Sequence, residues 1–357
     1  MLETARGGLL RSGLGYKTAD VGVVLNVQPD HLGMQNIRDL DELAKVKAVV
    51  AEAVREGGTT VLNADDPKCV EMTEYCRENV VLFSLRSSNP VVLEHVDRGG
   101  AAVVCEQGYL AVLGDDRLLP VARIEDIPLT MGGKAAFNVQ NALAATAAAY
   151  AHGVDVDEIR RGLISFLPSP LQTPGRLNLI SVGGVDYLLD YAHNPHAYKN
   201  LLELVVHMGD RRRVIVFDVV GDRRDEDIEE VCTLVAPVFD AIVLYEAADL
   251  RGREPGELMA LQQRYLAAAG FDAAAIEAVG DEREAIRRAA AAAGPGDLVC
   301  YMTGHVHDGI QWLHEFAEGG GAEASDAALA TDASARAAAG AAAAVPAADA
   351  PATEGGE

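Results

Sequence analysis

The stretch Leu189-Asp190-Tyr191-Ala192-His193-Asn194-Pro195 joins the end of an apolar strand to a cluster of polar side chains. The strand runs over residues 185–189, and Pro195 stands where a helix takes its first turn, a position that suits proline's fixed φ and missing N–H. Open α/β sheets bind ligands at the carboxyl ends of their strands. Taken alone, Asp190 could be a helix cap and His193 a hydrogen-bonded loop residue. The stretch therefore predicts an α/β unit and suggests a ligand site.

The second half of the chain repeats this alternation of apolar strand and amphipathic helix. Each apolar run is followed by a segment whose apolar residues recur at helical spacing. The pattern predicts strands near 185–190, 213–218, 240–245 and 297–302, and helices near 196–207, 225–237, 255–269 and 281–293. Strand–helix–strand units of this kind form parallel sheets with right-handed crossovers. We expect a Rossmann-like domain here.

The first half opens another α/β unit. Residues 21–27 form a continuous apolar run, typical of a strand buried on both faces, and a helical period covers residues 39–54. Asp39 can cap this helix, and Gly57-Gly58 is expected to end it. The next strand follows at 60–62. Two strand–helix units in succession predict a mostly parallel, doubly wound sheet.

A run of short β segments comes next, separated by Gly or Asn-Pro breaks. They predict an antiparallel sheet appended to the first unit, with segments at Val80–Ser84, Val91–Glu94, Ala101–Glu106, Tyr109–Leu113 and Leu118–Val121. Helices are expected at roughly 137–152 and 155–166, before a linker that contains Pro168, Pro170 and Pro174.

These elements divide the α/β chain into three parts: a first domain at 1–167, a second at 168–318 and a tail at 319–357. The tail consists mainly of Ala, Gly, Ser, Thr, Pro and acidic residues without periodicity. Such a segment cannot bury enough apolar area to offset the entropy lost on ordering, so we expect the tail to be disordered.

Composition excludes several classes of partner. The chain carries 54 acidic and 30 basic residues, a net charge of −24, which argues against binding to nucleic acid or to an anionic membrane. Carboxylates are, however, the groups from which Mg²⁺ sites are built. No long uncharged span or cleavable signal peptide is evident. The five cysteines are scattered without a CxxC pair, as expected of reduced thiols in a cytoplasmic protein.

Several polar clusters at expected strand ends occur together in a fixed order. The segments are Asp30-His31-Leu32, Leu62-Asn63-Ala64-Asp65-Asp66, Phe137-Asn138-Val139-Gln140-Asn141, Pro174-Gly175-Arg176 and Asp190-Tyr191-Ala192-His193-Asn194-Pro195. Over about residues 1–316, this order resembles the Mur ligase superfamily of ATP-dependent amide ligases. Within it, residues 2–11, 30–33 and 43–47 look like the Mur-type half of the cyanophycin synthetases.

The resemblance implies that ATP phosphorylates an acceptor carboxylate and that an amine then attacks the acyl phosphate. It implies that Glu3 and His31 hold Mg²⁺, although His31 could instead belong to a capped turn after Pro29. Lys47 resembles a lysine that is carbamylated in many family members and supports a second metal. Lys45 lies close by, and for either residue the alternative is a solvated helix lysine.

By the same resemblance, other residues bind the nucleotide. Asn138 and Asn141 lie one helical turn apart and would contact the adenine, with a helix N-cap as the alternative for Asn138. Arg176 would reach the phosphates through its planar fork of donors. Asp190 would anchor the nucleotide from the second domain, and Asn194 would line the same cleft.

The candidate catalytic residues are Lys47, His193 and Arg223. His193 would line the nucleotide cleft beside Asp190. Arg223 belongs to a Gly221-Asp222-Arg223 loop, where the resemblance implies that the arginine faces the incoming amino acid or the phosphates. The alternative for 222–227 is a solvated charge run at the start of a helix.

The sequence departs from this family in one respect. No Gly-x-x-x-x-Gly-Lys-Ser/Thr loop, which cradles ATP phosphates, occurs in the chain, and no ATP-grasp half is present. The first domain is therefore expected to be a truncated Mur ligase central domain that lacks the phosphate loop. Alone, the chain should bind ATP weakly and not turn over. A separate N-terminal half could complement it in trans.

If complete, such an enzyme is expected from the resemblance to add arginine to the aspartate β-carboxylates of a polyaspartate backbone. A different reading is a non-catalytic Mur-like scaffold or oligomerisation module of a polymer-synthesising complex. Whether the chain is an enzyme by itself stays open, as does a homo-oligomeric state. A complete peptidoglycan ligase is excluded by the missing phosphate loop and UDP-sugar domain.

Overall fold

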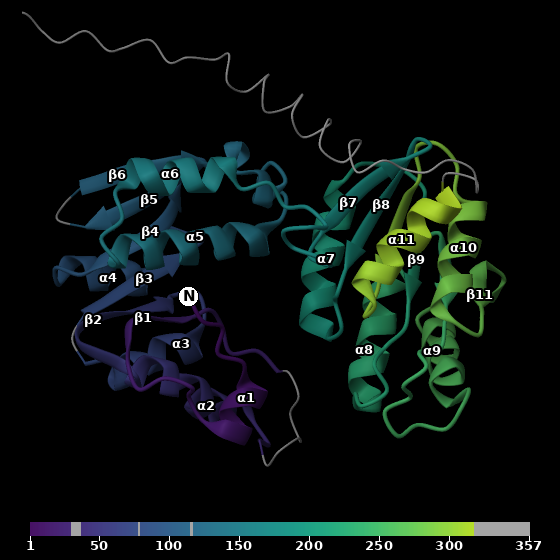
Figure 1. The fold of residues 1–357 in the computed structure, drawn as a ribbon, viewed down its shortest axis with the longest axis horizontal. Coiled ribbons are helices and arrows are strands. Elements are labelled where there is room, and N and C mark those ends of the chain that lie inside the picture. Colours follow the sequence, from purple (N-terminus) through teal and green to yellow (C-terminus); the bar gives the residue numbers. More distant parts are fainter. Residues whose placement is uncertain (30–36, 78, 115–116, 318–357) are drawn as a thin grey trace, which may run out of the picture.

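Two six-stranded sheets, one in each half of the chain, form the centre of the structure (Figure 1). The structure is a computed structural model that describes residues 1–29, 37–77, 79–114 and 117–317. The predicted α/β class is confirmed. Two expectations fall outside the described residues: His31, which belongs to the segment 30–36, and the disordered tail at 319–357.

The first sheet is parallel at one end and antiparallel at the other. Its strands lie side by side in chain order: β1 Ala19–Val24, β2 Val54–Asn63, β3 Asn79–Ser84, β4 Ala101–Glu106, β5 Tyr109–Gly114 and β6 Arg117–Arg123. Strands β1 to β4 pair in parallel, whereas β4–β5 and β5–β6 pair antiparallel. The β segments after residue 79 thus continue the first sheet rather than forming an appended one.

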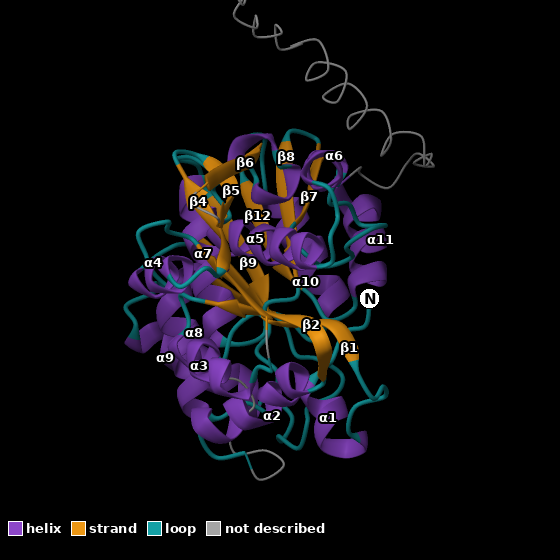
Figure 2. Cartoon of the chain, turned by 90° about the vertical axis from the view of Figure 1, so that its left-hand side faces the viewer, coloured by secondary structure: helices purple, strands orange, loops and turns teal. Residues whose placement is uncertain are grey.

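Helices cover both faces of this sheet. They are α1 Arg6–Ser12, α2 Leu40–Glu52, α3 Pro67–Glu71, α4 Pro90–Asp97, α5 Ala136–Ala151 and α6 Val156–Ser165, with 3-10 turns η1 Met72–Tyr75, η2 Ile124–Asp126 and η3 Pro128–Thr130. Because side chains alternate along a strand, Val61 packs towards α5 and α6 whereas Leu62 packs towards α2 and α3. Figures 1 and 2 show α1 beside α2, so the Gly-containing start of the chain includes a short helix.

Two further expectations for this half are wrong. The segment Val91–Glu94 lies in α4 and not in a strand, because Asn89 caps the helix by accepting from the Val91 N–H and Pro90 occupies its first turn. The pair Gly57-Gly58 lies inside β2 instead of ending α2. A Cβ on Gly58 would lie 2.7 Å from the Asp20 carbonyl oxygen, so glycine here permits the close approach of β1 and β2.

The second sheet is parallel except for one edge strand. In spatial order it contains β11 Ile276–Ala278, β10 Ala241–Leu244, β9 Arg213–Phe217, β12 Leu298–Met302, β8 Val185–Asp190 and the antiparallel β7 Asn178–Val182. The strands predicted from the apolar runs are all present. Strands β7 and β11 were not expected, because a polar residue interrupts the apolar side chains in each.

Five helices and one 3-10 turn flank this sheet. They are α7 Pro195–His207, α8 Asp225–Val235, α9 Glu257–Ala268, η4 Ala273–Ala275, α10 Glu282–Ala292 and α11 Val306–Ala317. Core residues of α7, α8 and α9 share one apolar cluster, and those of α10 and α11 share another on the opposite face. Pro195 begins α7 as the sequence predicts. Helix α11 had no counterpart in the expected elements.

Candidate functional site

Asp190 is the last residue of β8, and its carboxylate holds the turn that precedes β7. Its Oδ2 accepts from the Leu177 N–H at 3.0 Å, and Leu177 has a left-handed φ of 50°. Burial raises the pKa of the Asp190 carboxyl to about 6, while the neighbouring charge of Arg176 opposes this shift. Asp190 is not a helix cap, because Asn194 caps α7 by accepting from the Ala197 N–H at 2.9 Å.

Arg176 and His193 gather around one aromatic ring. The Arg176 guanidinium lies 5.6 Å from the centre of the Tyr191 ring. The ring centres of Tyr191 and His193 are 5.0 Å apart, and His193 Nδ1 lies 2.9 Å from the Tyr191 carbonyl oxygen. Three of the predicted residues, Arg176, Asp190 and His193, therefore share one small region.

The turn after β12 packs against this region, a feature that the sequence reasoning missed. The Thr303 N–H donates to the Asp190 carbonyl oxygen at 3.1 Å. A Cβ on Gly175 would lie 2.5 Å from a methyl group of Val306, so the glycine makes room for that side chain. The sequence did contain a signal for this turn: the polar residues Thr303 and His305 come directly after the predicted strand at 297–302.

A buried carboxylate supports the same turn. Glu282, in the first turn of α10, is only 8% exposed. Its Oε1 accepts from the Tyr301 hydroxyl at 2.8 Å, and its Oε2 lies 2.7 Å from His305 Nδ1. This pair joins α10 to the end of β12, and it gives a buried carboxylate the partners that it needs.

The amides at the start of α5 form a second cluster. Asn141 Nδ2 donates to Asn138 Oδ1 at 3.1 Å, which confirms that the two amides share a helix face. Asn138 is 7% exposed, and its Nδ2 donates to the Leu129 carbonyl oxygen at 3.0 Å. The alternative of an N-cap role for Asn138 is wrong, since the residue before the helix is Ala135.

The start of α5, which carries the second cluster, lies close to α7 and the turn that carries the first (Figure 1). Ala135 lies in the same apolar cluster as Ala192 and Tyr198, and Phe137 packs against that cluster. Asp66, at the carboxyl edge of the first sheet, acts electrostatically on His196 in α7: desolvation lowers the pKa of His196, and the charge of Asp66 opposes that shift. The first turns of α5 and α7 therefore belong to one interdomain region.

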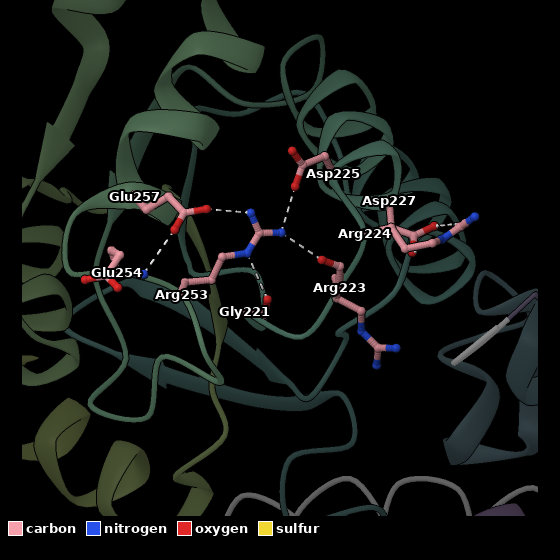
Figure 3. A network of polar contacts seen from close by, with 8 residues as sticks. All are labelled: Gly221, Arg223, Arg224, Asp225, Asp227, Arg253, Glu254 and Glu257. Atoms are coloured by element: carbon pink, nitrogen blue, oxygen red, sulfur yellow. Dashed lines mark hydrogen bonds and ion pairs between the residues drawn. The ribbon is translucent and has the colours of Figure 1, made fainter. Parts of the chain in front are cut away.

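Arg223 lies in the turn between β9 and α8. It is 7% exposed, so the alternative of a solvated charge run does not hold for this residue. That description fits Arg224, the residue before α8, and Asp227 in its first turn, which pair with each other and are more exposed. Figure 3 shows the Arg223 side chain pointing away from the neighbouring Arg253.

Comparison with known proteins follows the same two halves. Residues 1–149 match the family model described as the Mur ligase middle domain, and residues 175–304 match the model described as Mur ligase, glutamate ligase domain. The chain belongs to the Mur ligase family. Among curated Mur-type relatives, it is 43% identical over 313 residues to a cyanophycin synthetase of Trichormus variabilis, and 47% identical over 260 residues to one of Synechocystis.

These alignments cover 88% and 72% of this chain but only 35% and 29% of the relatives, so the chain spans about a third of their length. Solved Mur ligases share its fold. MurF from Acinetobacter baumannii superposes with a TM-score of 0.60 at 18% identity, covering 83% of this chain and 60% of that one. MurF from Thermotoga maritima, solved with ADP, gives 0.58 at 18% identity, covering 84% and 63%.

Of the two lysines that could match the family's modified lysine, the structure separates Lys47 from Lys45. Lys47 is partly buried, and its Nζ donates to the Asn26 carbonyl oxygen at 2.7 Å, just beyond β1. Lys45 is exposed on α2. A solvated helix position therefore describes Lys45 and not Lys47.

The described residues do not test whether Glu3 and His31 lie together to hold Mg²⁺. Glu3 is exposed in the segment before α1, and His31 lies outside the described residues. Within the described ranges, no group of three or more His, Cys, Asp or Glu side chains is placed to hold a metal ion. The ranges likewise contain no helix long and apolar enough to cross a bilayer, and all five cysteines are free thiols.

A second buried carboxyl lies directly after β9. Asp218 Oδ1 accepts from Gln262 Nε2 and its Oδ2 from the Ala247 N–H, both at 3.2 Å. Burial raises the pKa of Asp218 to about 7. These contacts connect the carboxyl ends of β9 and β10 to α9.

This raised pKa predicts a pH-dependent stability. Between pH 4 and 7 the folded chain holds a proton on Asp218 that the unfolded chain has released, so stability is lost as the pH rises through this window. Between pH 5 and 8 the resulting loss in the free energy of unfolding is roughly 2–3 kcal/mol. We expect D218N to flatten this part of the profile, measured by urea unfolding at both pH values. The exposed D210N is the control, and equal pH profiles for D218N and the unsubstituted chain would contradict the prediction.

Proposed function

We propose that this chain is the Mur-type part of an ATP-dependent amide ligase of the cyanophycin synthetase kind. ATP would phosphorylate the β-carboxylate of an aspartate-containing polymer, and the α-amine of arginine would displace the phosphate to form the amide. The observation that carries the proposal is the 40–47% identity to cyanophycin synthetases over most of the chain. Conjugation of this kind requires positive charge around two approaching anions.

The geometry supports a division of roles between the two lobes. Asn138 and Asn141 would contact the adenine from α5. Arg176, beside Asp190, would meet the phosphates, and a carboxyl whose pKa is raised by burial suits a hydrogen bond to the nucleotide. Asn194 would line the same cleft. Its side-chain oxygen also caps α7, because it accepts from the Ala197 N–H.

The remaining roles concern charge. Glu3 offers a hard oxygen ligand, and one or two carboxylates together with substrate phosphates form a usual set for Mg²⁺, so Glu3 and His31 would hold the ion. Bound there, Mg²⁺ supplies neutralisation of the phosphate charge. Lys47, rather than Lys45, is the candidate for carbamylation. His193 and Arg223 would face the reacting groups from the second lobe.

The phosphates also need a cradle of backbone N–H groups, and this chain has no Gly-x-x-x-x-Gly-Lys-Ser/Thr loop. We therefore propose that turnover needs a phosphate-binding loop from outside these 357 residues, of the kind that the N-terminal half of such an enzyme would supply.

A complementation experiment tests the proposed function. The purified chain is mixed with the N-terminal half of a cyanophycin synthetase, ATP, Mg²⁺, arginine and polyaspartate, and amide formation is followed by mass spectrometry. We expect no product from the chain alone, product from the mixture, and a loss of about 100-fold or more in the D190A/H193A double variant. Circular dichroism checks that the variant folds.

Three other outcomes of this experiment would contradict parts of the proposal. Ligation by the chain alone would refute the need for a second half. Ligation that tolerates the D190A/H193A change would favour a scaffold. A mixture in which both parts fold and bind each other but form no product would overturn the ligase function itself.

A further inference from the structure

The guanidinium of Arg253 bridges two loops at the carboxyl edge of the second sheet (Figure 3). Its Nε donates to the Gly221 carbonyl oxygen at 3.0 Å, and its Nη2 to the Arg223 carbonyl oxygen at 2.9 Å. The same Nη2 donates to Asp225 Oδ1 at 2.7 Å, and Nη1 to Glu257 Oε1 at 2.9 Å. Four acceptors therefore surround one side chain, which is only 16% exposed.

The two loops that it joins are in direct contact. A Cβ on Gly221 would lie 2.3 Å from the Leu250 carbonyl oxygen, so only glycine allows the backbones to approach this closely. Arg251 adds a weaker link, because its Nη1 lies 3.3 Å from Asp222 Oδ2. The turn between β9 and α8 is thus held from outside by the loop between β10 and α9.

The acceptors of Arg253 distinguish this contact from an ordinary surface ion pair. Two of the four are main-chain carbonyl oxygens of the turn itself, at Gly221 and Arg223. A planar guanidinium can donate to all four at once through its fixed fork of N–H groups, whereas an ammonium cannot match this geometry. Arg253 therefore fixes the backbone from which the Arg223 side chain projects.

We propose that Arg253 is a positioning residue that sets the direction of Arg223 by clamping the Gly221–Arg223 turn. The functional half of this inference rests on the proposed ligase function, in which Arg223 faces the reacting groups. The structural half does not. Asp225 and Glu257 complete the clamp by neutralising the Arg253 charge and by joining the starts of α8 and α9.

Arg224 provides a matched control. It pairs with Asp227 three residues along on α8, and this contact links no second loop. Loss of such an exposed pair has little effect on a protein. R224Q therefore removes a neighbouring arginine without removing a clamp.

The first experiment measures amide hydrogen exchange of residues 221–225 in the full chain. We expect R253A to speed this exchange about tenfold or more, R253K to give a smaller increase, and R224Q to give none. Millimolar guanidinium should restore slow exchange in R253A by filling the vacated position, and it should not affect R224Q. Unchanged exchange in a folded R253A, or exchange raised equally by R224Q, would overturn the proposal.

The second experiment uses the complemented ligation mixture. If Arg253 acts through Arg223, R253A and R223A should each lower kcat/KM, and R223A/R253A should lose no more than R223A alone. Guanidinium should rescue R253A but not the double variant. Fully additive losses would show that Arg253 acts independently and would refute the positioning role. Absence of ligation in every mixture would count against the proposed function only, because hydrogen exchange still decides whether Arg253 clamps the turn.

Discussion

Replacing Glu282 by alanine is expected to lower the free energy of unfolding by about 2–4 kcal/mol. The carboxylate accepts from the Tyr301 hydroxyl and pairs with His305, and it is 8% exposed. Its removal leaves the buried Tyr301 hydroxyl without this acceptor and opens a cavity between α10 and β12. Urea unfolding at pH 7 measures the loss.

Glu284 is the control for this change, because it lies on the same helix and pairs with Arg287 and Arg288 at the surface. E284A should change stability little. E282Q keeps the volume and one acceptor, so its cost should lie between those of E282A and E284A. If E282A is no more damaging than E284A, the buried pair contributes nothing to the fold, and the turn after β12 must be held in another way.

The second large effect is expected at Asp66, where alanine should cost about 2–4 kcal/mol. One carboxylate oxygen accepts from the Lys68 and Cys69 N–H groups at the start of α3, and the other accepts from the Val27 N–H at 2.7 Å. Asp66 is 5% exposed, so none of these donors gains water easily when the carboxylate is lost.

Asp155 is the control that distinguishes the loss of a helix cap from the loss of the long-range bond between Asp66 and Val27. It caps α6 by accepting from the Asp157 N–H, and it is exposed and makes no bond to a distant loop that the structure describes. D155A should therefore cost about 1 kcal/mol. Thermal and urea unfolding of both variants give the comparison, and equal losses would mean that the bond to Val27 adds nothing.

The site residues differ in how far the sequence could place them. Asp190 and His193 fall in a motif at the end of a recognisable strand, whereas Arg176 belongs to the Pro174-Gly175-Arg176 motif of the linker, and the structure brings the three together. Asn138 and Asn141 were placed correctly on one helix face because helical spacing is a local property. The roles of these residues remain predictions, as does the Mg²⁺ pairing of Glu3 with His31.

Errors in the sequence-based description arose where one pattern fits two structures. Val91–Glu94 is rich in valine, which favours a strand, yet Asn89 and Pro90 start a helix there. Gly57-Gly58 suits a helix end, yet it lies in β2 because β1 approaches too closely for a side chain at Gly58. In both cases a capping bond or a neighbouring strand outweighed local preference.

By itself, the sequence determined the alternation of strands and helices, the α/β class and the family. The spacing of apolar residues and the order of the motifs can both be read along the chain without knowing how it folds. Only the tertiary structure revealed that Glu282 holds His305 and that Arg253 holds the Gly221–Arg223 turn. These partners come from segments far apart in the chain, and two of the acceptors of Arg253 are main-chain carbonyl groups, which every residue carries. A contact with a group common to all residues leaves no pattern in a sequence, so it becomes visible only when the chain is folded.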